Sequence, residues 1–200
     1  MGNRLPLSVF RTACWRWCFG SVKLVRIMKT RRLQFRPLER GDAPRIAALA
    51  GDWAVASMTA RIPFPYDEAQ SQEWISGLEE NEFVRAVTLE GELIGAVGYF
   101  PHDDGSVEIG YWIGQPWWGR GFATEAAAML VRYCFTNQGM ARLVCCHFID
   151  NQASQRVIEK LGFKSTGTCR AYCEARKSDV ATVRYEMRRP LMAMFWRRAA

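Results

Sequence analysis

The sequence predicts a mixed α/β domain, and three observations lead to this fold class. Three strand patterns follow one another through tight turns, as in an antiparallel meander: 83–89, 93–100 and 107–113. The apolar spacing then changes to that of a helix over 123–135. A nearly continuous apolar run at 141–149 predicts a strand buried on both faces. The strand–helix–strand unit implies a right-handed crossover with parallel pairing, so we expect a mixed sheet with helices packed on it.

The other elements follow from local signals. Alternating polar and apolar residues at 31–36 predict a strand with one buried face. Asp67 and Gln70 form a capping-box pattern for a helix that runs to about Glu80. We expect an ordered loop at 62–66 and further elements at 43–50, 52–60, 151–161, 163–168 and 181–187.

The net charge of +7 is unevenly distributed along the chain. Residues 1–27 hold five basic residues and no acidic one, so they supply +5 and the rest of the chain supplies +2. A length of 200 residues fits one domain, which we place at 28–190, with a basic extension at 1–27 and a tail at 191–200. Met28 directly precedes the first strand pattern, so it is a candidate initiator that would leave 1–27 untranslated.

The composition disfavours several classes of protein. There is no run of 18 apolar residues to predict a membrane span, and the first 27 residues lack the features of a secretory signal. Basic and aromatic residues alternate only near the two ends, which disfavours nucleic acid as a partner. The seven cysteines and two histidines do not follow the common spacing of zinc sites, so we expect no metal. Reduced cysteines in a cytoplasmic protein are the resulting expectation.

The turn after the third strand of the meander is rich in glycine. Gly119 and Gly121 let the backbone approach an anion without a Cβ in the way, and Ala123 keeps the next turn thin. The N-terminus of a helix offers unpaired N–H groups and the positive end of its dipole, which suit phosphate. The Thr124 hydroxyl would add one hydrogen bond. The alternative is a tight connection that binds nothing.

A second signal lies about thirty residues later, where the next strand meets its helix. Asn151 and Ser154 are three residues apart and share one face at the carboxyl edge of the sheet, where ligands gather in open α/β sheets. The alternatives are an ordinary N-cap for Asn151 and a small first-turn residue for Ser154. The two signals in combination favour a binding site.

These segments resemble the two coenzyme A motifs of the GNAT N-acetyltransferases. The matching runs are Trp-Gly-Arg-Gly-Phe-Ala-Thr-Glu-Ala at 118–126, Asn-Gln-Ala-Ser at 151–154 and Glu-Lys-Leu-Gly-Phe at 159–163. The run Glu-Ile-Gly-Tyr-Trp-Ile at 108–113 and the loop 62–66 are similar to the RimJ/RimL-type branch, the ribosomal-protein N-terminal acetyltransferases and their relatives. The resemblance implies a central, mostly antiparallel sheet of six to seven strands, with coenzyme A between two splayed parallel strands.

The resemblance also implies the cosubstrate and the residues that bind it. Acetyl-CoA would give its acetyl group directly to a primary amine in a ternary complex. Ile113 and Gly114 would pair with the pantetheine arm. Asn151 would hydrogen-bond that arm, and Ser154 would lie near the thioester sulfur. The pyrophosphate would be held by the turn residues Trp118, Gly119, Arg120, Gly121, Phe122, Ala123 and Thr124.

Acetyl transfer needs a base for the amine and an acid for the departing thiolate. Glu108 is the candidate base, and the alternative is a surface glutamate paired with Arg85 or another arginine. The wider superfamily often has a tyrosine acid where this chain has Ile158. The catalytic candidates are therefore Glu108 and Ser154, with water as the alternative acid.

The acceptor stays open between a protein N-terminal α-amine and a small-molecule amine. Its side of the site is expected to include Trp53, the loop 62–66, Glu108 and the segment around Arg170 and Tyr172. We expect no membrane partner and a monomer or homodimer. The missing tyrosine keeps an alternative function open, a catalytically inactive coenzyme A-binding or interaction module.

Overall fold

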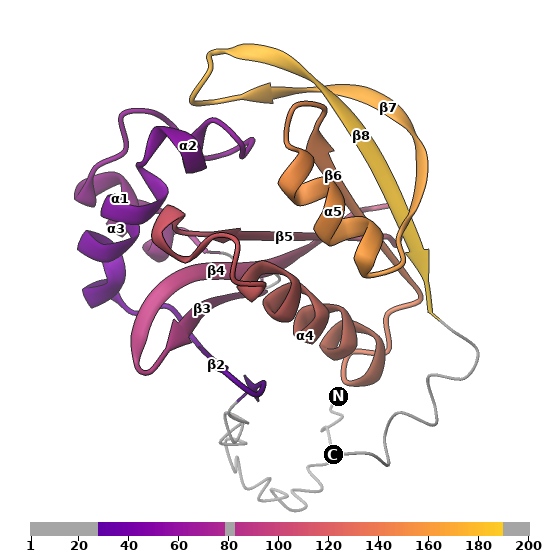
Figure 1. Cartoon of the computed structure of the whole chain (residues 1–200), viewed down its shortest axis with the longest axis horizontal. Helices are drawn as coiled ribbons and strands as arrows, with labels where there is room; N and C mark the ends of the chain where they lie inside the picture. Colours follow the sequence, from indigo (N-terminus) through magenta and orange to yellow (C-terminus); the bar gives the residue numbers. More distant parts are fainter. Residues whose placement is uncertain (1–27, 79–82, 190–200) are drawn as a thin grey trace, which may run out of the picture.

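The computed structural model describes residues 28–78 and 83–189. One eight-stranded sheet runs through this part of the chain in the order β1-β2-β3-β4-β5-β6-β8-β7 (Figure 1). Neighbouring strands pair antiparallel except β5 and β6, which pair parallel as expected. The extension expected at 1–27 and the tail expected at 191–200 lie outside the described residues.

The elements alternate along the chain in the order that the sequence indicates. The strands are β1 Met28–Lys29, β2 Leu33–Arg36, β3 Phe83–Leu89, β4 Glu92–Pro101, β5 Val107–Ile113, β6 Arg142–Phe148, β7 Lys164–Cys173 and β8 Ser178–Arg188. The α-helices are α1 Ala43–Ala50, α2 Trp53–Ala56, α3 Glu68–Ser76, α4 Phe122–Thr136 and α5 Gln152–Lys160, with 3₁₀ turns η1 Arg40–Asp42 and η2 Gln115–Trp117. None of the helices within the described ranges is long and apolar enough to cross a bilayer.

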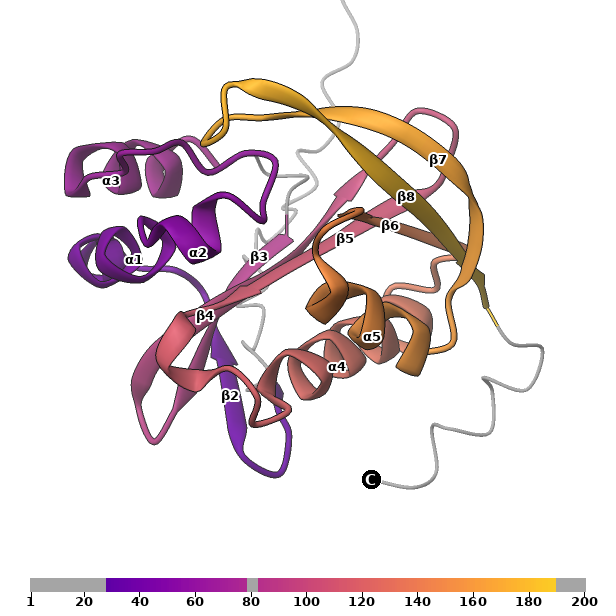
Figure 2. The same cartoon turned by 45° about the horizontal axis from the view of Figure 1, so that its top comes forward.

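The two faces of β5 pack against different helices. Ile109 and Ile113 belong to the main core, where Ala126 and Leu130 of α4 are fully buried. Because strand side chains alternate, Trp112 leaves the opposite face and joins a smaller core built on α1. Figure 2 shows α4 and α5 together on one side of the sheet, with α1, α2 and α3 grouped apart from them. β5 is therefore a central strand with helices on both faces.

The structure confirms the fold class, and most boundaries agree with the sequence prediction. The additional strand, β1, has two residues, too few to leave a pattern in the sequence. The predicted capping box is present, because Asp67 Oδ1 accepts from the Gln70 N–H at 2.8 Å and Gln70 Oε1 accepts from the Asp67 N–H at 3.0 Å. The helix ends at Ser76 rather than near Glu80, because Gly77 follows as its C-cap.

The helix expected over 52–60 is shorter than predicted because its carbonyls bond to a distant segment. Arg176 Nε donates to the Ser57 carbonyl at 2.7 Å, and the Glu174 N–H donates to the Ala60 carbonyl at 2.9 Å. Both donors lie at the tip of the β7–β8 hairpin, whose strands are longer than the expected 163–168 and 181–187. Figure 1 shows this hairpin reaching over the molecule to α2. We call residues 57–62 the strap, because they connect the α1–α3 group to this tip.

Candidate active site

β5 and β6 separate soon after they begin. They pair only at Val107↔Leu143 and Glu108↔Val144, whereas β4 and β8 continue to pair with their outer edges. The gap between the two strands opens into a cavity of about 1420 Å³. This cavity is lined by every site residue named from the sequence except Gly114 and Arg120. The fold therefore brings two segments about thirty residues apart to one opening.

The glycine turn gives α4 an open N-terminus. Gly119 and Gly121 have φ values of +72° and +79°, which are strained for any residue with a Cβ. In the described structure no side chain caps α4. The N–H groups of the first helical turn, at Phe122, Ala123 and Thr124, therefore keep no helical partner and lie where the cavity is lined by the same residues. This arrangement can bind an anion through backbone donors and the helix dipole.

A set of contacts from the first hairpin holds this turn in place. Glu125, in the first turn of α4, accepts hydrogen bonds from the Thr30 hydroxyl at 2.5 Å and from Arg32 Nε at 2.7 Å. Arg32 Nη1 also donates to the Arg120 carbonyl at 3.0 Å. Burial alone would raise the pKa of Glu125, but the hydrogen bonds from Thr30 and Arg32 hold that pKa below its usual range. The carboxylate is thus ionised and fastens the start of α4 to the β1–β2 end of the sheet.

Two backbone groups at the end of β5 already have partners within the protein. The Trp118 indole Nε1 donates to the Ile113 carbonyl at 2.6 Å, and the Gly114 N–H donates to the Ile94 carbonyl at 2.8 Å. Bonding alternates along an antiparallel strand, so Tyr111 and Ile113 turn their backbone groups away from β4 and toward the gap. Because the Ile113 carbonyl is bonded to Trp118, the groups left open to a ligand are the backbone N–H and C=O of Tyr111 and the N–H of Ile113, rather than those of Gly114.

The start of α5 carries Asn151 and Ser154, as expected, and Tyr111 of β5 contacts it. Asn151 is the N-cap: its Oδ1 accepts from the Ser154 N–H at 3.0 Å and its Nδ2 donates to the Met58 carbonyl at 3.4 Å. The Ser154 and Tyr111 hydroxyls are 2.9 Å apart. Burial raises the pKa of Tyr111, so this phenol stays protonated and can donate to Ser154. Ile158 lies in the main core and is 1% exposed.

Glu108 leaves β5 at the narrow end of the gap, on the face opposite Tyr111. Its Oε2 lies 3.1 Å from His102 Nε2, and its Oε1 accepts a weak hydrogen bond from Cys146 Sγ at 3.7 Å. The ion pair with Arg85 is not formed, because that guanidinium lies 4.0 Å from the Phe83 ring centroid. A third of the Glu108 side chain is exposed, which leaves the carboxylate accessible from the cavity.

Cys146 is a thiol in the same gap, yet it is poorly suited to act as a nucleophile. It is exposed at the cavity surface and crowded by the walls around it. The protein atoms around the thiol displace water that would solvate the thiolate. This desolvation, together with the neighbouring Glu108 carboxylate, raises the pKa of Cys146 to about 12. Its sulfur therefore stays protonated near neutral pH.

The expected acceptor side is assembled only in part. Trp53 and Ile62 line the cavity together with Glu108, and the Trp53 and Phe64 rings meet edge to face with centroids 5.1 Å apart. Of the expected segment around Arg170 and Tyr172, Ala171 lines the cavity, whereas Arg170 donates to the Asp179 carbonyl and neither it nor Tyr172 is part of the lining.

Two further residues were not singled out as site residues from the sequence. Tyr111 could have been found from strand alternation, since it lies on the face of β5 that looks toward α5. Arg61 lines the cavity through long-range contacts, for which the local sequence gives no signal.

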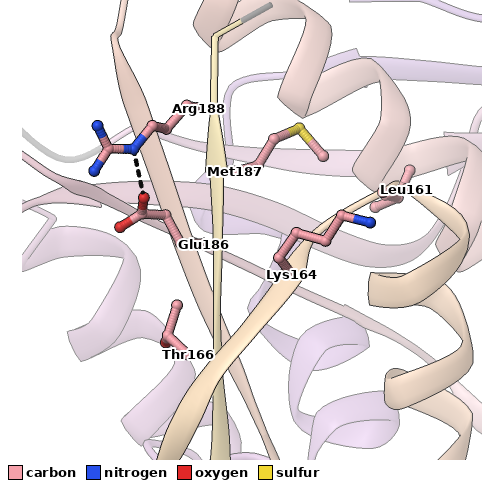
Figure 3. A pocket seen from close by; sticks show the side chains of 7 residues that line it. Leu161, Lys164, Thr166, Glu186, Met187 and Arg188 are labelled. Carbon is pink, nitrogen blue, oxygen red and sulfur yellow. Dashed lines mark hydrogen bonds and ion pairs between the residues drawn. The ribbon is translucent and has the colours of Figure 1, made fainter.

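A smaller depression of about 520 Å³ lies between the end of α5 and the β7–β8 hairpin (Figure 3). Glu186 and Arg188 form an ion pair at its edge, with Arg188 Nε 2.9 Å from Glu186 Oε1. It shares no lining residue with the large cavity. The described ranges also contain no group of three or more His, Cys, Asp or Glu side chains arranged to hold a metal ion. The large cavity is therefore the candidate site.

Comparison with known proteins relates this chain to acetyltransferases at the level of both sequence and fold. The acetyltransferase (GNAT) domain family matches residues 32–164. The uncharacterized N-acetyltransferase p20 of Bacillus licheniformis is 30% identical over 156 residues, which cover 74% of this chain and 87% of that protein. Among solved structures, the ribosomal-protein-S5-alanine acetyltransferase of Vibrio fischeri superposes with a TM-score of 0.70 at 18% identity, over 82% of this chain and 97% of that one. RimJ of Mycobacterium smegmatis in complex with CoA-disulfide superposes with a TM-score of 0.70 at 22% identity, over 78% and 81%.

Proposed function

This chain belongs to the GNAT family of N-acetyltransferases, and from that premise we propose that it transfers the acetyl group of acetyl-CoA to a primary amine within a ternary complex. The observation that carries the proposal is the gap between β5 and β6, which has an open helix N-terminus at one end and a glutamate at the other. The RimJ structure, which contains CoA-disulfide on the same fold, supports the choice of cosubstrate.

The residues of the cavity fit acetyl-CoA. The uncapped first turn of α4 and the turn 119–121 supply backbone N–H donors suited to a pyrophosphate, whereas the Trp118 N–H already donates to the Gln115 carbonyl. The open edge at Tyr111 and Ile113 suits the amide groups of a pantetheine arm. Asn151 lines the cavity and would contact the bound arm there, although its amide oxygen already caps α5. The bound cosubstrate supplies the acetyl thioester.

The protein's own groups would then manage the protons. Glu108 accepts the proton of the attacking amine as the new N–C bond forms. Backbone N–H groups at the open edge of β5 stabilise the oxyanion of the tetrahedral intermediate. Ser154, hydrogen-bonded to Tyr111, donates a proton to the thiolate that leaves when the C–S bond breaks. Each of these groups lines the same cavity.

The acceptor is a primary amine, either a protein N-terminal α-amine or the amine of a small molecule. The Vibrio fischeri relative acts on an alanine of a ribosomal protein, which supports the first class. The cavity is large enough for either.

The test is the release of free thiol from acetyl-CoA in the presence of amines and N-terminal peptides, with mass spectrometry to identify the acetylated product. We expect thiol release that depends on the amine and a product heavier by one acetyl group. If acetyl-CoA binds but no amine in a broad panel is acetylated, the protein is a coenzyme A-binding module and the proposal fails.

A further inference from the structure

Arg61 lines the large cavity, and its guanidinium forms no ion pair with an acidic residue in the described part of the chain. Its guanidinium carbon lies 4.5 Å from the centroid of the Phe100 ring. The planar group is therefore held against an aromatic face, while its edge, which carries five N–H donors, stays available. Stacked arginines of this kind are well suited to bind a carboxylate with two parallel hydrogen bonds.

Phe100 connects Arg61 to the candidate base. Phe100 is directly opposite Glu108 in the β4–β5 pair, and side chains opposite each other in an antiparallel pair are neighbours on one face. Both Arg61 and Glu108 line the cavity. Gly110 follows Glu108 on the same face, and a Cβ there would meet only Phe100 Cε2, at 3.9 Å. His102 and Cys146 contact the Glu108 carboxylate, whereas the surface of β5 at Gly110 carries no side chain of its own.

The strap fixes the backbone on both sides of Arg61. On one side, the Ala60 carbonyl accepts from the Glu174 N–H at 2.9 Å. On the other side, Ile62 packs against both smaller cores, the one that contains Trp112 and the one that contains Phe148. A side chain with an anchored backbone and a stacked head group loses little conformational freedom when it binds a ligand. Arg61 is exposed, but its anchored backbone and its contact with the Phe100 ring prepare the guanidinium to bind an anion.

We propose that Arg61 binds an anionic group of the acceptor, which is therefore a primary amine with a carboxylate a few bonds away, as in a free amino acid. The inference rests on the proposed function, because it takes Glu108 as the group that receives the amine. With the amine at Glu108, a carboxylate on the same acceptor would be directed toward the Arg61 guanidinium, which lines the same cavity. A peptide N-terminus has a neutral amide at that point and would leave the guanidinium without an ionic partner.

Matched acceptors test this directly: L-amino acids and their amides, which offer the same amine with and without the negative charge. For the wild-type enzyme, kcat/KM is expected to favour the acid. In Arg61→Ala, kcat/KM for the acid should fall about 10- to 100-fold, chiefly through KM, while the amide should change less than threefold, since a charge-assisted pair has been lost. For each acceptor, the ratio of kcat/KM in the wild type to kcat/KM in Arg61→Ala is independent of the pKa of its amine, so the ratios for acid and amide can be compared directly. Arg61→Lys should recover part of the loss.

A matched control is Arg45→Ala, because Arg45 also lies over an aromatic ring, that of Trp117, but does not line the cavity. It should leave the preference for the acid intact. An equal loss on acid and amide in Arg61→Ala overturns the inference and leaves the acetyltransferase proposal standing. So does a wild-type enzyme that favours amides and peptides when kcat/KM is referred to the concentration of unprotonated amine. Absence of thiol release with every acceptor, while acetyl-CoA still raises the melting temperature, overturns both.

Discussion

The side chain of Glu108 leaves β5 on the face that carries Trp112, whereas Tyr111 leaves the opposite face and meets Ser154. The two proton-handling groups proposed for the reaction are thus on different sides of one strand. Only the gap beyond the Glu108↔Val144 pair lets both reach one reacting centre. Loss of Glu108 should therefore affect removal of the amine proton, and loss of Ser154 should affect protonation of the thiolate.

For Glu108→Gln we expect turnover to fall about a hundredfold to ten-thousandfold, since a general base contributes this much. Binding of acetyl-CoA should change little, because the glutamate lies far along β5 from the glycine turn. The measurement is turnover against pH, with stability monitored alongside. Glu186→Gln is the control, since Glu186 lines only the smaller depression. Wild-type turnover in the Glu108 variant, or a loss explained by unfolding, would return the residue to a structural role.

For Ser154→Ala we expect turnover to fall about tenfold or more, and most of all at high pH, where solvent is the poorer acid for the thiolate. Tyr111→Phe removes one hydrogen bond to Ser154 and should lower turnover about two- to tenfold, in the same pH range. Burial raises the pKa of Tyr111, so its hydroxyl remains a donor throughout that range. Rate profiles from neutral to alkaline pH check this. A loss that is uniform across pH would assign both hydroxyls to packing.

At the scale of the element, α4 carries the anion site through its start rather than through any side chain. For Gly121→Glu we expect the rise in melting temperature caused by acetyl-CoA to disappear, because a negative charge would occupy the place of the pyrophosphate. Gly121 has a φ of +79°, so any side chain also costs about 1 to 2 kcal/mol in strain. Gly121→Ala carries that strain without the charge and is the control. An unchanged ligand shift in the glutamate variant would remove this turn from the site.

Glu125 links the same helix to β1 and β2, and its contribution to stability should depend on pH. Its pKa is lowered in the folded protein, so the stabilisation is fully present above the ordinary carboxyl pKa and is lost as pH falls through the folded pKa. Glu125→Gln should lower the free energy of unfolding by about 1 kcal/mol at neutral pH, since Arg32 is partly exposed. Denaturant unfolding at neutral and acidic pH measures it. The difference from wild type should shrink below about pH 4; a constant difference would contradict the ion-pair account.

At the scale of the whole molecule, what could be predicted from the sequence is what depends on neighbours along the chain. The Asp67–Gln70 capping box, the meander and the parallel crossover all rest on short-range signals, and all three are present. The length predicted for the helix at 52–60 was wrong, because the strap carbonyls bond to residues more than a hundred positions away. No local pattern carries such contacts.

The site follows the same division. The glycine turn and the start of α5 come from motifs that lie in continuous stretches, and the structure brings them to one cavity. The partners of Glu108 could not be read in the same way, since the position of His102 depends on the turn that joins β4 to β5. Arg61 becomes noticeable only once Phe100 is known to lie opposite Glu108.

The gap between β5 and β6 also has a consequence for the order of events. One cavity is lined by Ser154 from one face of the sheet and by Trp112 from the other, so it is open to both faces. A donor held at α4 and an amine entering beside Arg61 therefore do not obstruct one another, and neither has to depart before the other arrives. Initial rates at several fixed amine concentrations should give intersecting double-reciprocal lines. Free coenzyme A should compete with acetyl-CoA and not with the amine. Parallel lines would instead require an acetylated enzyme, a role that the protonated thiol of Cys146 does not favour.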